Sequence, residues 1–114
     1  MATFPKMFNH ITPSAQEMIE AKGLATILGK VFEEIQTLQS PEPRIQKIEV
    51  DWEVDPEVKG WEMLTITLWS EGSPDDAHNL WRDLDKVMNA LRQKVSKAEL
   101  HKLNRLVSVG VDIE

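Results

Sequence analysis

Apolar residues recur every three or four positions between residues 14 and 38, the spacing of one buried stripe on a helix. Ser14 and Glu17 stand at the start of this segment, and their spacing predicts a capping box. The residues Ser-Pro-Glu-Pro at positions 40–43 end it, because proline cannot continue a helix. Gly23 costs a helix about 1 kcal/mol relative to alanine. The pattern therefore allows one long helix or two helices that meet near Gly23.

A second segment with helical spacing covers residues 73–95, and its buried stripe includes Leu80, Trp81 and Leu84. The residues Ser-Pro-Asp-Asp at positions 73–76 predict its start, since they supply a hydroxyl cap, a proline for the first turn and acids for the positive end of the helix dipole. The capping-box spacing returns at positions 96 and 99. A short helix is expected there, either as a separate turn or as a continuation of the long one.

Three segments alternate apolar and polar residues, which is the two-residue period of a β-strand with one buried face. They are residues 47–55, 61–69 and 106–113. The first two are separated by a segment with proline at position 56 and glycine at position 60, which predicts a hairpin loop. Residues 1–12 have no clean period, and we expect them to form an irregular N-terminal strap.

Taken in order, these elements predict a single α+β domain over residues 1–114, with the sequence α-β-β-α-(α)-β. Crossover connections between strands of one sheet are right-handed, so the third strand should run parallel to the second if both share a sheet. We expect a three-stranded mixed sheet with the helices on one face. The strand orders 1-2-3 and 2-1-3 both remain open.

This order of elements resembles the type II KH fold, a family of nucleic-acid-binding modules. The resemblance is one of outline, because no Gly-x-x-Gly loop joins two helices near Ser96 and the overall charge is acidic. It implies a nucleic-acid-binding module that uses the basic segment 86–105, and this is the alternative function.

Charge is distributed unevenly along the chain, which has 114 residues, a formal net charge of −6 and no cysteine. Residues 49–62 hold six acids and one lysine, whereas residues 86–105 hold six basic residues and one acid. An acidic surface attracts basic partners. The absence of cysteine excludes a disulfide framework, a thiolate metal site and a thiol nucleophile. Without a signal peptide or an apolar run of roughly 18 residues, the expected location is cytoplasmic.

The nearest match to a metal motif lies in the acidic segment. Asp51, Glu53, Asp55 and Glu62 fall at positions 1, 3, 5 and 12 of an EF-hand loop. Pro56 takes the sixth position, where that loop needs glycine, and the flanking residues have strand periodicity. We therefore predict a solvated acidic strand face and no bound metal.

The sequence contains no recognisable catalytic motif. His10, His78 and His101 stand in three different elements, without a spacing that would direct two of them to one ion. Asp75 and Asp76 could act with His78 as acid and base, but helix capping explains both aspartates. None of the six serines lies in a nucleophile motif, and no glycine-rich phosphate loop is present. We predict that the protein is not an enzyme and needs no cofactor.

The sheet face opposite the helices is left without an element to cover it, unless the N-terminal strap, with Phe4, Met7 and Phe8, folds over it. Tryptophan on such a face is typical of an interface anchor. We predict a partner-binding surface made of six residues: Trp61, Met63, Trp69, Glu49, Asp51 and Glu53.

These observations favour a small acidic protein-interaction domain. Its partner is expected to be a basic protein, as for an antitoxin or immunity-type protein that masks a basic active site, or a second copy packed face to face.

Overall fold

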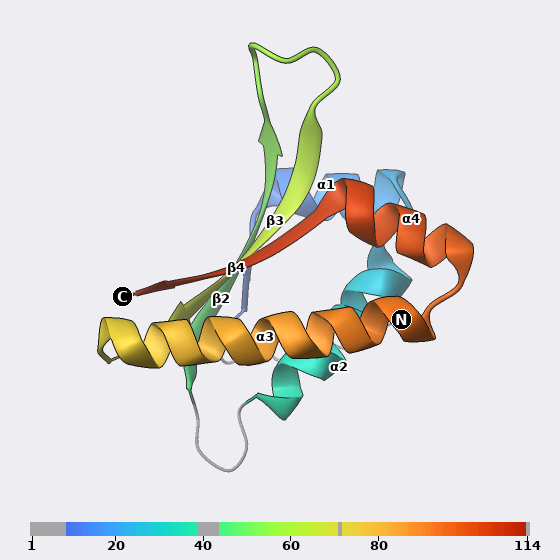
Figure 1. Ribbon diagram of the computed structural model, residues 1–114. Coiled ribbons are helices and arrows are strands. Elements are labelled where there is room, and N and C mark those ends of the chain that lie inside the picture. The colour runs from blue at the N-terminus through green and yellow to red at the C-terminus, as the bar shows by residue number, and fades with distance from the viewer. Residues whose placement is uncertain (1–8, 39–43, 71, 114) are drawn as a thin grey trace.

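A mixed four-stranded sheet forms the centre of the computed structural model, which describes residues 9–38, 44–70 and 72–113 (Figure 1). The elements of the described residues, in chain order, are β1 (Asn9–Ile11), α1 (Pro13–Ala21), α2 (Ala25–Thr37), β2 (Ile45–Val54), β3 (Glu62–Ser70), α3 (Pro74–Lys94), α4 (Lys97–Leu106) and β4 (Val107–Ile113). This confirms the predicted α+β class and the order of the elements between positions 13 and 113. No helix in the described ranges has the length and apolar content needed to cross a membrane.

The strands lie in the order β1-β2-β3-β4. β1 runs parallel to β2, β2 antiparallel to β3, and β3 parallel to β4. The predicted parallel pair is confirmed, and the three predicted strands have the order 1-2-3. The expectation of a three-stranded sheet was wrong, because residues 9–11 of the supposed strap pair with residues 48–50 of β2. Three residues are too few to show a period, so only this pairing reveals the strand. Residues 1–8 of the strap lie outside the described residues.

The start of α1 differs from the predicted capping box. Thr12, and not Ser14, is the N-cap, and its hydroxyl accepts a hydrogen bond from the backbone N–H of Ala15 at 3.2 Å. Pro13 occupies the first turn, where its fixed φ suits a helix and its missing N–H costs nothing. Since the cap must precede that first turn, Ser14 lies inside the helix.

Of the two possibilities left open for the first helical segment, the structure has the pair of helices. Gly23 adopts a left-handed φ of 63° between α1 and α2, a conformation that favours glycine. The backbone N–H of Leu24 donates to the carbonyl of Ile19 at 2.9 Å and closes the end of α1. Ser73 and Ser96 cap α3 and α4 as predicted, and α4 is a separate helix. Asp76 also completes a capping box with Ser73, which the spacing did not predict.

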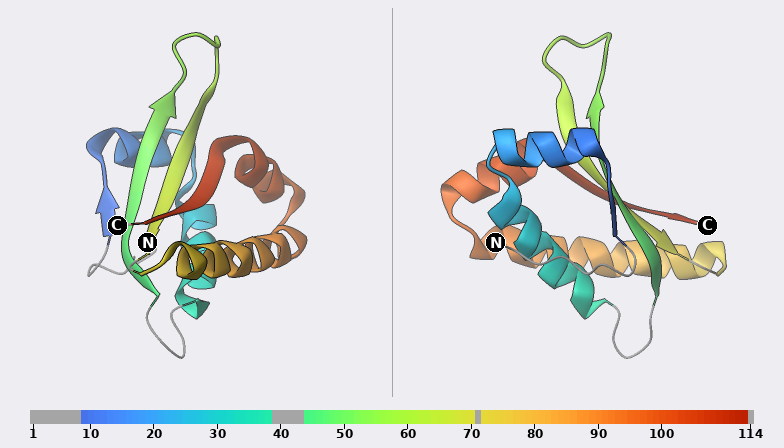
Figure 2. Two further views of the ribbon diagram at one scale, coloured as in Figure 1. Left: turned by 60° about the vertical axis from the view of Figure 1, so that its left-hand side comes forward. Right: turned by 180° about the vertical axis from the view of Figure 1, so that it is seen from behind.

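The helices lie on one side of the sheet (Figure 2), and one hydrophobic core fills the space between them and that face. Ile48 and Val50 of β2 are fully buried, as are Leu64, Ile66 and Leu68 of β3, and all four helices contribute buried side chains. The alternate residues of the strands consequently point away from the helices. The β2–β3 hairpin projects beyond the helical layer, and Val54 and Val58 are exposed there (Figure 1).

Candidate functional site

The sheet face that points away from the helices, called the outer face below, is where the predicted partner-binding residues were expected. Its residues follow from the strand register, in which Lys47, Trp69 and Asp112 form one row across the sheet. The outer face comprises His10, Lys47, Glu49, Asp51, Glu53, Met63, Thr65, Thr67, Trp69, Ser108, Gly110 and Asp112. Five of the six predicted residues therefore share this face.

Trp61 is the exception. It precedes β3, and its backbone closes the hairpin, donating to the carbonyl of Val58 and accepting from the N–H of Asp55, both at 3.1 Å. Its side chain is 41% exposed. Trp61 is thus an exposed aromatic residue beside the outer face and not a member of the strand pattern.

Trp69 is more enclosed than the sequence suggested. The ammonium group of Lys47 lies 5.1 Å from the centroid of its ring, a cation–π contact, and also 3.0 Å from the carboxylate of Glu49. The indole Nε1 is buried and has no hydrogen-bond acceptor within the described ranges. Lys47 consequently covers Trp69 and offsets the charge of Glu49.

The uncompensated negative charge lies nearer the hairpin. Asp51 accepts a hydrogen bond from the hydroxyl of Thr12 at 2.9 Å, which fixes the carboxylate without neutralising it. Glu53 is exposed on the next outward position of β2, and Asp55 and Glu57 follow in the hairpin loop. The acidic part of the outer face is therefore continuous with the hairpin.

The residues of the EF-hand-like spacing do not converge. Asp51 and Glu53 lie on the outer face, Asp55 accepts from the backbone N–H of Glu57, and Glu62 lies 3.9 Å from Lys22. Within the ranges that the structure describes, no three histidine, aspartate or glutamate side chains come together as metal ligands.

The candidate acid–base group at the start of α3 is arranged as a helix cap. Ser73 and Asp76 exchange two hydrogen bonds, both at 3.2 Å. His78 stacks on Trp81 with ring centroids 6.4 Å apart. Trp81 was expected in the buried stripe of this helix, and that expectation was wrong, because the side chain is 50% exposed.

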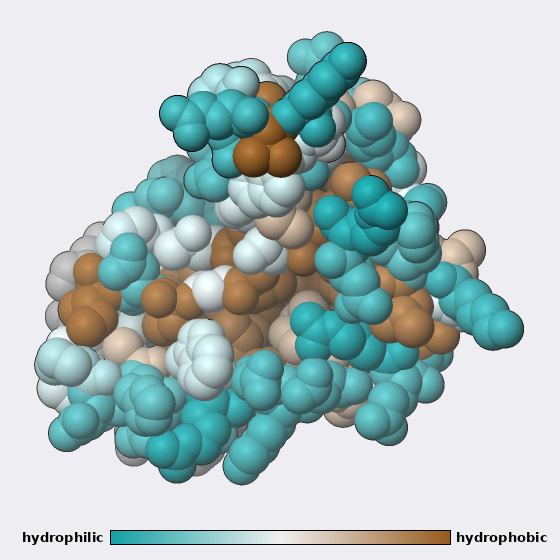
Figure 3. Space-filling model, turned by 45° about the horizontal axis from the view of Figure 1, so that its top comes forward, coloured by the Kyte–Doolittle hydropathy of each residue, from teal (hydrophilic) through white to brown (hydrophobic). Residues whose placement is uncertain are grey.

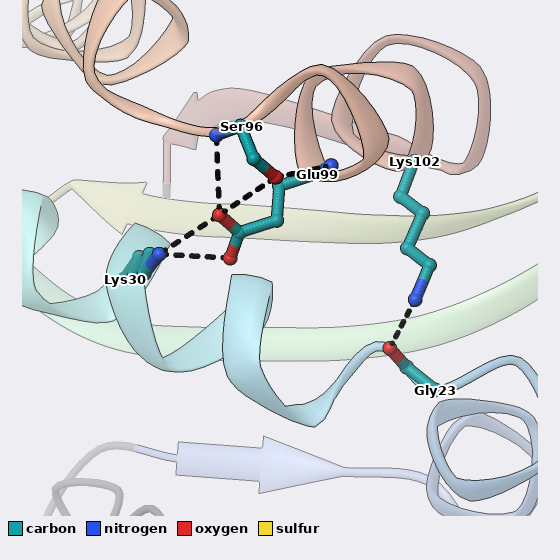
Figure 4. Close-up of polar contacts among 5 residues, drawn as sticks. All are labelled: Gly23, Lys30, Ser96, Glu99 and Lys102. Atoms are coloured by element: carbon teal, nitrogen blue, oxygen red, sulfur yellow. Dashed lines mark hydrogen bonds and ion pairs between the residues drawn. The ribbon is translucent and has the colours of Figure 1, made fainter.

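Two lysines of the basic segment 86–105 bind residues of the first helical segment, and Figure 4 shows one of them, Lys102. Lys102 donates to the carbonyl of Gly23 at 3.0 Å, and Lys94 binds Glu34 at 2.8 Å. The single acid of the segment, Glu99, binds Lys30 through both carboxylate oxygens, at 3.0 and 2.8 Å. The hydrogen bond from Lys30, followed by that from the backbone N–H of Ser96, holds the pKa of Glu99 below its usual range.

A groove of about 290 Å³ between α3 and β4 was not foreseen. Its apolar lining includes Leu84, Met88, Val107 and Val109, and Trp81 stands at its side. Figure 3 shows the hollow and its hydrophobic residues below the hairpin. The sequence gives little indication of this groove. Trp81 has the spacing of the buried stripe, so its spacing alone predicts burial, whereas beside the groove its side chain is exposed.

No family model, curated protein or solved structure matches this chain.

Proposed function

We propose that the protein is a non-enzymatic interaction domain that binds a basic segment of another protein through the acidic part of its outer face. The observation that supports this proposal is the row of Glu49, Asp51 and Glu53, at successive outward positions of β2 and with no described helix over them. An antitoxin or immunity-type protein, which masks a basic active site, is one form of this function.

The spacing of the acids indicates the chemistry of the partner. Alternate residues of a strand are about 6.6 Å apart, since the rise is about 3.3 Å per residue. An extended peptide with lysine or arginine at every second position has the same repeat. Such a segment, laid along β2, would bring successive cations to Asp51, Glu53 and the hairpin acids. The exposed ring of Trp61 is available beside it as an aromatic anchor.

Binding of this kind depends on salt concentration. The carboxylates are solvent-exposed, and exposed ion pairs contribute about 0.2–1 kcal/mol each and are screened by salt. Their larger effect is on the rate of association and on the choice of partner. We therefore expect moderate affinity for a lysine-rich strand and rapid exchange.

The test uses the whole protein and a synthetic eight-residue peptide in which lysine and threonine alternate. Changing Asp51→Asn, Glu53→Gln and Glu57→Gln together should weaken binding roughly tenfold at low salt, from three exposed pairs of about 0.5 kcal/mol each, since Lys47 already offsets Glu49. Fluorescence anisotropy of the labelled peptide measures the affinity. Asn at position 51 retains an acceptor for Thr12, so the free energy of unfolding should stay within about 1 kcal/mol of the wild type.

A matched control removes three carboxylates from the helical side, with Glu17→Gln, Glu20→Gln and Glu33→Gln; all three side chains are exposed. This control should bind the peptide within about twofold of the wild type. Equal losses in the two triple variants would mean that the peptide responds only to net charge, and the proposed surface would be wrong.

Two other functions receive less support. Nucleic-acid binding by segment 86–105 would need free cations, whereas Lys94 and Lys102 are bound to Glu34 and Gly23. Face-to-face packing of two outer faces would set carboxylates of one copy against those of the other, and like charges brought together in this way are destabilising. Tight, salt-dependent binding of an RNA or DNA oligonucleotide would favour the first of these over the proposed function.

A further inference from the structure

β4 has an open edge. One side of the strand pairs with β3, and no described strand lies on the other side. β4 is seven residues long, alternates valine with small or polar residues and contains neither proline nor lysine. Edge strands are usually kept short, charged, interrupted by proline or covered, because their free N–H and C=O groups accept another strand. The other edge strand, β1, has only three residues.

The groove between α3 and β4 borders this open edge. Ser108 of the outer face and Val109 of the core face both line it, as expected where a groove follows a strand edge. α3 runs antiparallel to β4 beside it (Figures 1 and 2). Trp81 is 50% exposed on the helix and Ile113 is 39% exposed at the end of the strand. An added strand would cover both kinds of group, the backbone edge and the apolar side chains.

We propose that a second copy of this chain occupies the edge, with its β4 antiparallel to the first about a twofold axis at Gly110. Gly110 is the middle residue of β4, so this register pairs the whole strand with itself. Two four-stranded sheets would join into one continuous sheet of eight strands. A twofold interface of this kind closes on itself and limits the assembly to a dimer.

The strand is self-complementary in this register. Val109 lies opposite Val111 of the second copy, and Val107 lies opposite Ile113, so that apolar residues meet on the core side. On the outer side Ser108 lies opposite Asp112, and the two Gly110 residues face each other. No charge of β4 is opposed by a like charge on the other β4. The exposed Ile113 of each copy is brought to the groove end lined by Val107 and Met88 of the other.

Charge also favours a second copy as the occupant. Asp112 is the only charged side chain of β4. Opposite Ser108, which lines the groove, Asp112 would lie at the rim of the groove end that holds Arg92, whose guanidinium is oriented by Asn104 at 3.2 Å and Asn89 at 2.8 Å. The acid of the groove, Asp85, is seven residues from Arg92, about 10 Å along the helix axis. Each copy thus places a carboxylate at the rim of the groove end that holds a cation of the other.

Such a dimer is independent of the proposed partner function. Edge pairing at β4 leaves the acids of β2 and the β2–β3 hairpin accessible in both copies, because β3 separates β4 from β2. If no dimer forms, the peptide-binding proposal is therefore unaffected. If the peptide does not bind, the dimer proposal is unaffected in turn.

Disulfide formation tests the register directly, because the chain has no cysteine of its own. Directly opposed residues of an antiparallel pair have Cα atoms about 4.5–5.5 Å apart, within the range that a disulfide bridges. Gly110→Cys should form a covalent dimer under mild oxidation, as seen on a non-reducing gel. A Cβ at this position meets nothing within 4 Å, so the variant should fold.

Ser108→Cys and Asp112→Cys are the matched controls. Each alone should give little covalent dimer, whereas an equimolar mixture of the two should cross-link, because only the mixture opposes the two thiols. If either control variant by itself cross-linked as much as Gly110→Cys does, the disulfides would arise from random collisions and the proposed register would be wrong.

Sedimentation equilibrium tests the association without cross-linking. The wild type should be dimeric at tens of micromolar. Gly110→Lys places two cations together at the axis and should raise the dimer Kd at least tenfold, while Ser108→Lys opposes Asp112 and should leave the dimer intact. A wild type that stays monomeric at 100 µM, together with no cross-linking of Gly110→Cys, would overturn the proposal.

Discussion

At the scale of single residues, Glu99 shows how one side chain serves two roles. Its carboxylate caps the first turn of α4 by accepting from the N–H of Ser96 at 3.3 Å, and it binds Lys30 of α2 (Figure 4). The cap was foreseen from local spacing. The bond to Lys30 was not, because 69 residues separate the two partners.

The lowered pKa of Glu99 leads to a prediction about acid stability. A group whose pKa is depressed by folding stabilises the protein above its unfolded pKa, near 4.3 for glutamate, and this contribution is lost as the pH falls through the lower folded value. Glu99→Gln keeps a capping side chain but lacks the charge. Its urea midpoint should lie below that of the wild type at pH 7, and the gap should narrow below about pH 4.

Urea unfolding followed by far-UV circular dichroism at pH 7 and pH 3 measures this. Glu17→Gln, an exposed change on α1, controls for the loss of one carboxylate. If the urea midpoints of Glu99→Gln and the wild type differed by the same amount at pH 7 and pH 3, the ionised carboxylate would contribute nothing to stability.

At the scale of elements, the caps decide where the helices begin. Thr12 caps α1 and also donates its hydroxyl to Asp51, so one side chain joins the start of a helix to the outer face of β2. The parallel pairing of β1 with β2 brings Thr12 to this place, and its backbone N–H donates to the carbonyl of Val50 at 3.0 Å. A prediction from spacing alone chose Ser14, two positions later.

The two candidate caps can be distinguished by mutation. Thr12→Ala should lower the free energy of unfolding by about 1 kcal/mol, the usual cost of losing an N-cap. Ser14→Ala should stay within about 0.5 kcal/mol, as for surface changes away from such features. Thr12→Ser keeps the hydroxyl, so its free energy of unfolding should stay closer to that of the wild type than to that of Thr12→Ala. The reverse order of effects in urea unfolding would assign the cap to Ser14 after all.

At the scale of the whole molecule, the two helix pairs are joined across one core. α2 packs against α3 and α4, and core residues come from all four helices and the sheet. Side-chain bonds from Lys30, Lys94 and Lys102 also connect the first helix pair with the second. Neither pair has a separate core of its own.

This arrangement predicts a single cooperative unfolding transition. Tryptophan fluorescence reports on the sheet, its hairpin and α3, while far-UV circular dichroism reports mainly on the helices. The two urea transitions should coincide at a fixed protein concentration, with a slope of about 1–3 kcal/mol/M. Separated midpoints would mean that the helices and the sheet do not unfold as one cooperative unit.

The sequence alone determined most elements and which face of each is buried. Strand alternation and helix caps depend on residues a few positions apart, so β2, β3 and β4, the caps at Ser73 and Ser96 and the shared face of Glu49, Asp51 and Glu53 could be predicted. Gly23 indicated where a break could fall, but the sequence left one long helix and two helices open, and the left-handed φ of Gly23 in the structure decides for two.

Only the tertiary structure decided features that need contacts between distant residues. β1 exists because β2 pairs with it, the strand order follows from how the crossovers pack, and Lys47 covers Trp69 across two strands. The groove and the exposure of Trp81 depend on how far α3 lies from the open edge of β4, a distance that no local pattern encodes. Periodicity can show that a side chain points toward the core, but packing determines whether another element is there to cover it.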